Sequence, residues 1–203
     1  EGSVQFKEAI DNLPEFTTTF SETRLSERLQ MVAKVIAARG DLGFSRQTFF
    51  INFGGWDHHD GVLEKQEEQL PVLSTALGEF LSALEELGVS DKVTTFTISD
   101  FGRTLTSNGN GSDHAWGGNA LVVGGGLNGG EIYGEYPSLE LENNLMLRRG
   151  RLIPTVSAAE YLAELALWFG VSPSDVNDIF PDLPNFFDTS QGTLPLGFLN
   201  PIA

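Results

Sequence analysis

The three histidines of this chain are its best candidates for metal or acid–base chemistry, because each lies close to an aspartate. Asp57 is followed by His58 and His59, and the third histidine follows Asp113 as His114. In an extended segment, residues two apart face the same side, so Asp57 and His59 can converge while His58 faces away. A carboxylate and two imidazoles suit a divalent ion such as zinc or manganese and leave open positions for a substrate. The first metal-ligand set is therefore Asp57, His59 and His114.

Two explanations of these Asp-His pairs stay open. Such pairs are common by chance, and either one can serve as a helix cap or as a loop hydrogen bond. All three histidines, however, lie in loops with glycine and tryptophan neighbours, beside segments that we expect to be strands. Because of this clustering, we keep a metal site as an interpretation alongside a purely structural role for the two pairs.

A second candidate group lies between the two Asp-His pairs, in the segment Ser99–Thr104. Asp100 follows an expected strand and offers a further metal carboxylate. Arg103 offers a planar fork that can hold a tetrahedral oxyanion through two hydrogen bonds. The alternative is a simple ion pair between Asp100 and Arg103. An anion site in an acidic chain needs a metal or an arginine to overcome the surrounding negative field.

Three other features are weaker candidates. Gly124–Gly129 matches the spacing of a dinucleotide-binding loop, but residues 131–137 are typical of a strand or turn where that loop requires a helix, so we expect a hairpin or a bend. Arg148–Arg151 contains three arginines and predicts the solvated turn of a hairpin, with weaker potential to bind an acidic group. Trp56 and Trp116 could stack on a polysaccharide, although packing beneath the loops is the alternative.

Hydrophobic periodicity predicts the elements that must position these residues. Helical spacing predicts helices, and short β-branched or aromatic runs predict strands. Pro71 should kink the second helix or begin a new one. The expected elements are helices over 24–39, 62–87 and 157–170, strands over 48–53, 92–98 and 120–123, and a proline-rich tail over 173–203 that wraps the surface.

This order predicts an α/β fold with a largely parallel sheet flanked by helices, which gathers chemistry beyond the carboxyl ends of its strands. The length of 203 residues favours a single domain over 1–203. Because the first residue is Glu1, we expect the chain to be the carboxyl-terminal portion of a longer one that lacks its amino-terminal part here.

Charge and composition exclude several partners. The chain has 12 basic against 28 acidic residues, a formal net charge of −16, which disfavours nucleic acid. No apolar run is long enough to insert into a membrane. With no cysteine, thiolate metal sites and cysteine nucleophiles are excluded.

Four segments together resemble a bacterial family known as a domain of unknown function, number 1501. The segments are Phe53–His59, Ser99–Thr104, Ser112–Gly118 and Arg151–Thr155, and the resemblance extends from about Phe49 to Phe180. That family is grouped with the alkaline phosphatase and sulfatase superfamily, α/β proteins that cleave phosphate or sulfate esters at one or two divalent metals. The resemblance also implies twin-arginine export, and hence a periplasmic or secreted protein.

Carried over by position, the resemblance implies one complete metal site and one damaged site. The first would use Asp57, His59 and His114. The second would retain Asp100, but Phe101 replaces its histidine unless Asp113 substitutes. The superfamily takes its nucleophile from an amino-terminal strand and helix that nothing here supplies, so this chain would need that missing part as a partner.

Two functions follow as expectations. The first is a metal-dependent hydrolase of a small anionic phosphate or sulfate ester, in which Arg103 steadies the oxyanion and Asp100 tunes the metal. The second is a non-catalytic binding or assembly module of an exported complex, which Phe101 favours.

Overall fold

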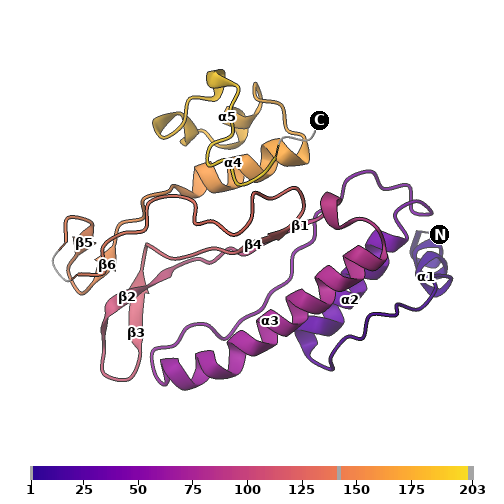
Figure 1. Ribbon diagram of the computed structural model, residues 1–203, viewed down its shortest axis with the longest axis horizontal. Helices are drawn as coiled ribbons and strands as arrows, with labels where there is room; N and C mark the ends of the chain where they lie inside the picture. Colours follow the sequence, from indigo (N-terminus) through magenta and orange to yellow (C-terminus); the bar gives the residue numbers. More distant parts are fainter. Residues whose placement is uncertain (1, 141–142, 201–203) are drawn as a thin grey trace. The chain divides into compact units, whose positions relative to one another are not determined.

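The structure, a computed structural model, describes residues 2–140 and 143–200. The chain divides into two compact units, Glu1–Val93 and Thr94–Ala203, and each is described by itself. Within the described residues, helices dominate the first unit and the strands lie in the second (Figure 1). The expected mixture of helices and strands is therefore confirmed. Among the described residues, no helix combines the length and apolar character that crossing a bilayer requires.

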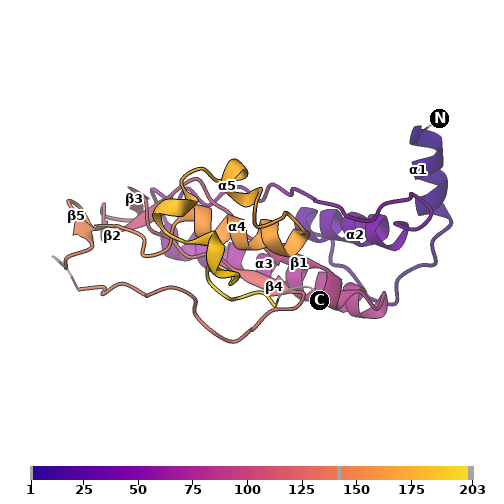
Figure 2. The ribbon, with the colours of Figure 1, turned by 90° about the horizontal axis from the view of Figure 1, so that it is seen from above.

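The first unit is built on two packed helices. Its elements are α1 (Gly2–Asp11), α2 (Arg24–Ala37), α3 (Val62–Glu86) and the short 3-10 helix η1 (Ser90–Lys92). The side chain of Thr23 caps α2 by accepting a hydrogen bond from the backbone N–H of Ser26. Apolar residues of α2 and α3 form one core, in which Leu29 and Phe80 are buried. Helix α1, which contains no buried residue, extends away from α2 (Figure 2). The predicted helix over 24–39 is confirmed, within two residues at its end.

Helix α3 runs as a single element through Pro71, so this proline does not begin a second helix. The buried residues of α3 all lie on its later half, from Ala76 onward. Before the proline, Leu63 is 76% exposed. Because proline inside a helix removes one backbone hydrogen bond, packing of the later half must stabilise the helix as a whole.

The predicted buried strand over 48–53 is wrong. These residues have no regular secondary structure, and Phe50 is 79% exposed. Ile51 and Phe53 turn toward the core of the first unit, so the alternation of an extended chain is kept. A strand needs the backbone groups of a neighbouring strand, and residues 2–93 contain none.

Glu86, at the end of α3, anchors the segment that leads into α2. Its carboxylate accepts hydrogen bonds from the backbone N–H groups of Thr17 at 2.8 Å and Thr18 at 3.0 Å, and from the Thr18 hydroxyl at 2.9 Å. These hydrogen bonds stabilise the charged carboxylate and lower the pKa of Glu86 to about 2. The bonds from the backbone N–H groups of Thr17 and Thr18 have the largest effect. The anchor is therefore complete above the ordinary glutamate pKa and is lost as the pH falls toward 2.

We expect the Glu86 carboxyl carbon to titrate in NMR well below the midpoint of an ordinary glutamate. The Thr17 amide signal should move with the same midpoint, because its hydrogen bond disappears when the carboxylate gains a proton. Glu86→Gln should abolish that movement, whereas Glu85→Gln, a change at the neighbouring exposed glutamate, should leave it intact. An ordinary midpoint for Glu86 in the unaltered protein would contradict this anchor.

The second unit contains three antiparallel strand pairs in place of the expected parallel sheet. Its strands are β1 (Thr94–Phe96), β2 (Gly102–Ser107), β3 (Ser112–Ala115), β4 (Val122–Gly124), β5 (Met146–Leu147) and β6 (Arg151–Leu152). β1 pairs with β4, β2 with β3 and β5 with β6, and no parallel pair occurs within residues 2–140 and 143–200. For the β2–β3 and β5–β6 pairs the physical reason is connection length, because four and three residues join the strands, whereas parallel neighbours need a crossover of about a dozen.

The carboxyl-terminal helix α4 (Ala158–Phe169) has the predicted boundaries and cap. Ser157 and Glu160 form a complete capping box, and Gly170 ends the helix at a φ of 105°, which favours glycine. The tail beyond it folds into α5 (Val176–Ile179) and two 3-10 helices, η2 (Leu183–Asn185) and η3 (Thr189–Gln191).

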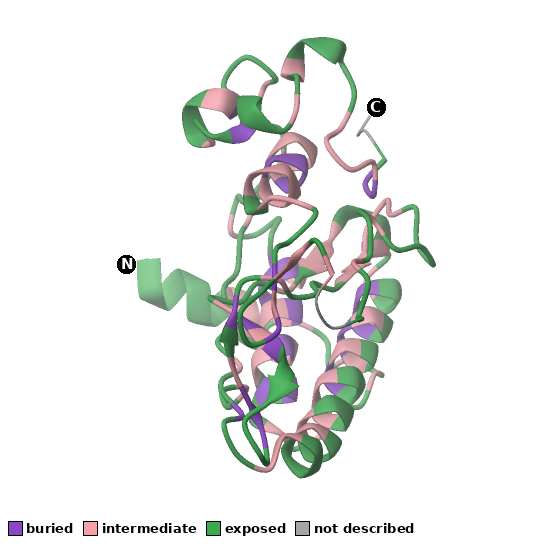
Figure 3. Ribbon diagram, turned by 90° about the vertical axis from the view of Figure 1, so that its left-hand side faces the viewer, coloured by how far each residue is buried: buried purple, intermediate pink, exposed green. Residues whose placement is uncertain are grey.

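This tail does more than cover a surface, because it contributes core residues. Leu183 is fully buried beside Ala163 of α4, and Phe198 and Leu199 are buried with Leu165. Figure 3 shows a buried stretch of the chain shortly before the C-terminus. The tail therefore completes the apolar core of the second unit.

Candidate functional site

In the first unit, the loop that follows Phe53 presents Asp57 and His59 together. The Nε2 atom of His59 lies 3.0 Å from the Oδ1 atom of Asp57, and about half of each side chain is exposed. His58, between them, is only 2% exposed. The prediction that Asp57 and His59 converge while His58 faces away is therefore confirmed.

Local packing explains why this loop takes that course. Gly55 adopts a φ of 96°, a left-handed conformation that a side chain would strain. The ring of Trp56 then packs edge-on against Phe53, with centroids 5.5 Å apart. Trp56 thus packs at the base of the loop, as the alternative to carbohydrate stacking predicts.

In the second unit, β2 and β3 present His114 and Arg103 side by side. The two residues are paired in the strand register, so both side chains lie on one face of the hairpin. The Nε of Arg103 donates to the Ser112 hydroxyl at 3.0 Å, and a terminal nitrogen donates to the Ser112 carbonyl. Ser112 therefore fixes the plane of the guanidinium beside His114.

Phe101, the residue that replaces a histidine in the family resemblance, stacks on His114. Their ring centroids are 3.9 Å apart and the rings are inclined by 13°. The Arg103 guanidinium carbon lies 5.7 Å from the Phe101 ring centroid. Stacking uses the face of the imidazole, whereas a metal bonds to a nitrogen in the ring plane, so the stack orients His114 without blocking ligation.

Glycine permits the close approach of segments around this hairpin. A β-carbon at Gly102 would overlap the backbone carbonyl of Gly117, and one at Gly150 would crowd the backbone N–H of Thr106. Glycine is therefore required at Gly102, because any side chain there would separate β2 from the segment around Gly117.

Asp113 faces the turn between β5 and β6. Its carboxylate lies 2.5 Å from a terminal nitrogen of Arg149 and accepts a second hydrogen bond from Asn108 at 3.2 Å. The predicted hairpin at Arg148–Arg151 is confirmed. No local pattern could reveal the contact of Arg149 with Asp113, because 36 residues separate the two.

The remaining candidates lie in exposed positions. Asp100 is exposed in the bend before β2, and Trp116 is 60% exposed after β3. The predicted bend at Gly124–Gly129 is confirmed, with a turn at Gly125 and Gly126.

Three exposed side chains, two in the first unit and one in the second, carry donor atoms that could ligate a metal ion. They are the carboxylate of Asp57 and the imidazoles of His59 and His114. One oxygen and two nitrogens form a donor set that suits zinc or manganese.

Comparison with known proteins supports the family and nothing more specific. The family model described as "Protein of unknown function (DUF1501)" matches residues 3–179. No curated protein and no solved structure matches the chain. Because the match covers most of the sequence, the chain belongs to the DUF1501 family.

Proposed function

We propose that this protein is a metal-dependent hydrolase of a phosphate or sulfate ester, of the alkaline phosphatase type, with Asp57, His59 and His114 as ligands of one divalent ion. The observation that carries the proposal is the meeting of Asp57 and His59 at 3.0 Å on an exposed loop. His114 supplies the third donor from the second unit, where Phe101 orients its ring.

The donor set fits a catalytic ion better than a structural one. Three protein ligands leave coordination positions for substrate and water, whereas structural zinc sites use four. When bound, such an ion polarises the ester and lowers the pKa of a coordinated water or hydroxyl.

The remaining residues have roles that follow from their contacts. Arg103, fixed by Ser112, places its guanidinium next to His114, where it can hold the oxyanion that develops on the ester. Asp100 adds an exposed carboxylate two residues before β2. Asp113 orients Arg149 by their ion pair, which holds the turn between β5 and β6 against β3.

Elemental analysis tests the proposal directly. Intact protein purified without chelator should contain about one zinc or manganese ion per chain. Asp57→Asn should weaken metal binding by more than about 100-fold, since loss of a direct ligand should exceed the cost of losing a second-shell partner. Asp41→Asn, the same change at an exposed site after α2, should have no effect. Metal-free unaltered protein would overturn the hydrolase proposal.

A second candidate function is a non-catalytic binding or assembly module of an exported complex. Phe101, an aromatic residue where the resemblance implies a histidine, favours it. A folded protein that lacks metal and hydrolyses no ester would support this module instead. Periplasmic or secreted location belongs to both proposals, and fractionation of the native cells tests it.

A further inference from the structure

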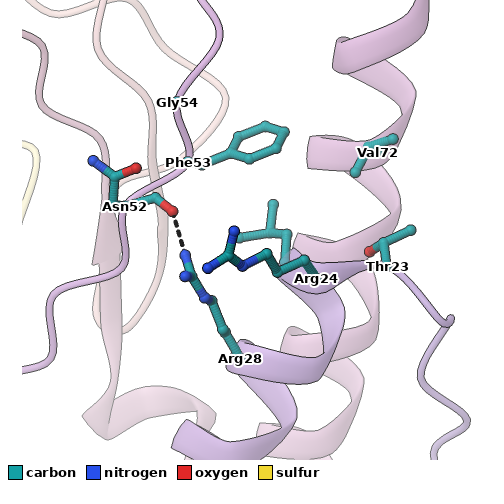
Figure 4. Close-up of a pocket in the computed structure, with 8 residues that line it drawn as sticks. Thr23, Arg24, Arg28, Asn52, Phe53, Gly54 and Val72 are labelled. Carbon is teal, nitrogen blue, oxygen red and sulfur yellow. Dashed lines mark hydrogen bonds between the residues drawn. The ribbon is translucent and has the colours of Figure 1, made fainter.

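We propose that the first unit contains a separate binding site for a small organic oxyanion with an apolar body. The site is a cavity of about 410 Å³ between the start of α2, the segment around Phe53 and the middle of α3 (Figure 4). We call it the arginine cavity, because Arg24 and Arg28 line it. Its volume lies in the range of small-molecule sites, roughly 300–1,000 Å³.

The two arginines are unfavourable for α2 itself. They lie four residues apart on the same helix, where like charges repel. They also lie toward the positive end of the helix dipole, where cations are disfavoured. A helix selected only for stability would not place both residues there, so the pair needs another explanation.

Contacts within the fold explain Arg28 but not Arg24. Arg28 donates a hydrogen bond to the backbone carbonyl of Asn52 at 2.6 Å, which ties α2 to the segment around Phe53. The Arg24 guanidinium has no hydrogen bond or ion pair with any residue in the described ranges 2–140 and 143–200. In Figure 4 it extends into the cavity between Arg28 and Phe53. An arginine without a protein partner, in a chain with 28 acidic residues, is available for a ligand.

The chemistry of the lining defines that ligand. The guanidinium groups can hold a phosphate or carboxylate by paired, charge-assisted hydrogen bonds. The rest of the lining includes the apolar side chains of Phe53, Leu25 and Val72. Phe53 offers an aromatic ring beside the guanidinium of Arg24, so an apolar or aromatic body can pack there while its oxyanion reaches the arginines.

An NMR titration of the full chain with phenyl phosphate tests this site. The protein is kept metal-free with chelator, so that ligation at the proposed metal site does not contribute. The amide signals of Asn52, Phe53 and Gly54 should shift on titration. Inorganic phosphate should shift the same signals with weaker affinity, because it has no apolar body.

The matched variants decide the role of Arg24. Arg24→Gln should raise the Kd for phenyl phosphate at least about tenfold, the loss expected for a charged hydrogen bond. Arg46→Gln, at an exposed arginine of the same unit outside the cavity, should leave the Kd unchanged. The amide spectrum of each variant confirms its fold. Absence of shifts at residues 52–54, equal affinity for the two anions, or an unchanged Kd in folded Arg24→Gln would each overturn the proposal.

Discussion

Glu164→Ala should lower the free energy of unfolding of the second unit by roughly 3 kcal/mol or more, the cost of leaving several buried donors without partners. Glu164 is fully buried in α4. Its Oε2 accepts hydrogen bonds from the backbone N–H groups of Leu196 at 2.6 Å and Gly197 at 2.8 Å, and its Oε1 accepts one from Leu199 at 2.8 Å. One carboxylate therefore holds the tail on α4.

Loss of this carboxylate acts on packing as well as on hydrogen bonding. Leu199, which is anchored, and Phe198, which lies between the anchored Gly197 and Leu199, fill the core beside Leu165. Without the anchor, three backbone N–H groups, in the half-buried Leu196 and Gly197 and the buried Leu199, would lose their partner unless the tail left the core. Either response destabilises the unit, so the effect should be large.

Urea denaturation, followed by the fluorescence of Trp168 in the same cluster, measures the effect. Glu164→Gln should also destabilise. Glutamine replaces one of the two acceptor oxygens by an amide nitrogen, and this donor would face a backbone N–H group that is also a donor. Glu131→Ala, at an exposed glutamate of the second unit, serves as the matched control and should leave the midpoint unchanged. A loss below about 1 kcal/mol for Glu164→Ala would contradict the anchor, since that is the net worth of a single ordinary hydrogen bond.

Arg103→Lys should lower kcat of the intact, metal-loaded protein by about 10²–10³, the usual effect of removing one preorganised oxyanion donor. Lysine keeps the charge but has no planar fork, so it cannot retain both contacts with Ser112 and the position beside His114. The measurement uses one chromogenic aryl phosphate and one aryl sulfate, which also indicates the preferred ester.

Metal content separates a catalytic role of Arg103 from a structural one. Arg103→Lys should bind zinc or manganese as the unaltered protein does, because the arginine is outside the proposed ligand set. Arg148→Lys, in the neighbouring turn between β5 and β6, should retain full kcat. Equal kcat for Arg103→Lys and the unaltered protein would remove Arg103 from the mechanism, and lost metal content would assign it to the structure of the site.

Local sequence rules predicted the helices well, because their signals lie within a few residues. The apolar spacing of α2 matches the buried residues Leu25, Leu29 and Ile36. For α4, the capping box at Ser157 and Glu160 and the stop at Gly170 are both where the sequence indicates. The predicted helix over 62–87 is also confirmed by α3, and only the alternative of a second helix beginning at Pro71 is wrong, because packing of the later half outweighs the local cost of the proline.

Two of the three predicted strands occur, since β1 lies within 92–98 and β4 overlaps 120–123. The pairing of the strands was predicted poorly, because it depends on partners that are distant in the chain. The segments that form β2 and β3 are rich in glycine, serine and threonine, and the sequence indicates a loop there. Conversely, residues 48–53 have the composition of a buried strand, yet their unit contains no strand to pair with. The expected parallel sheet was wrong for this reason.

The sequence by itself determined that Asp57 and His59 meet, because side chains two residues apart in an extended segment face the same side whatever the rest of the chain does. Only the tertiary structure decided what surrounds His114 and Asp113. Phe101 lies across His114 because β2 pairs with β3, and Arg149 meets Asp113 because the β5–β6 turn folds back over 36 residues. Such contacts depend on chain folding over distances that no local pattern of residue types encodes.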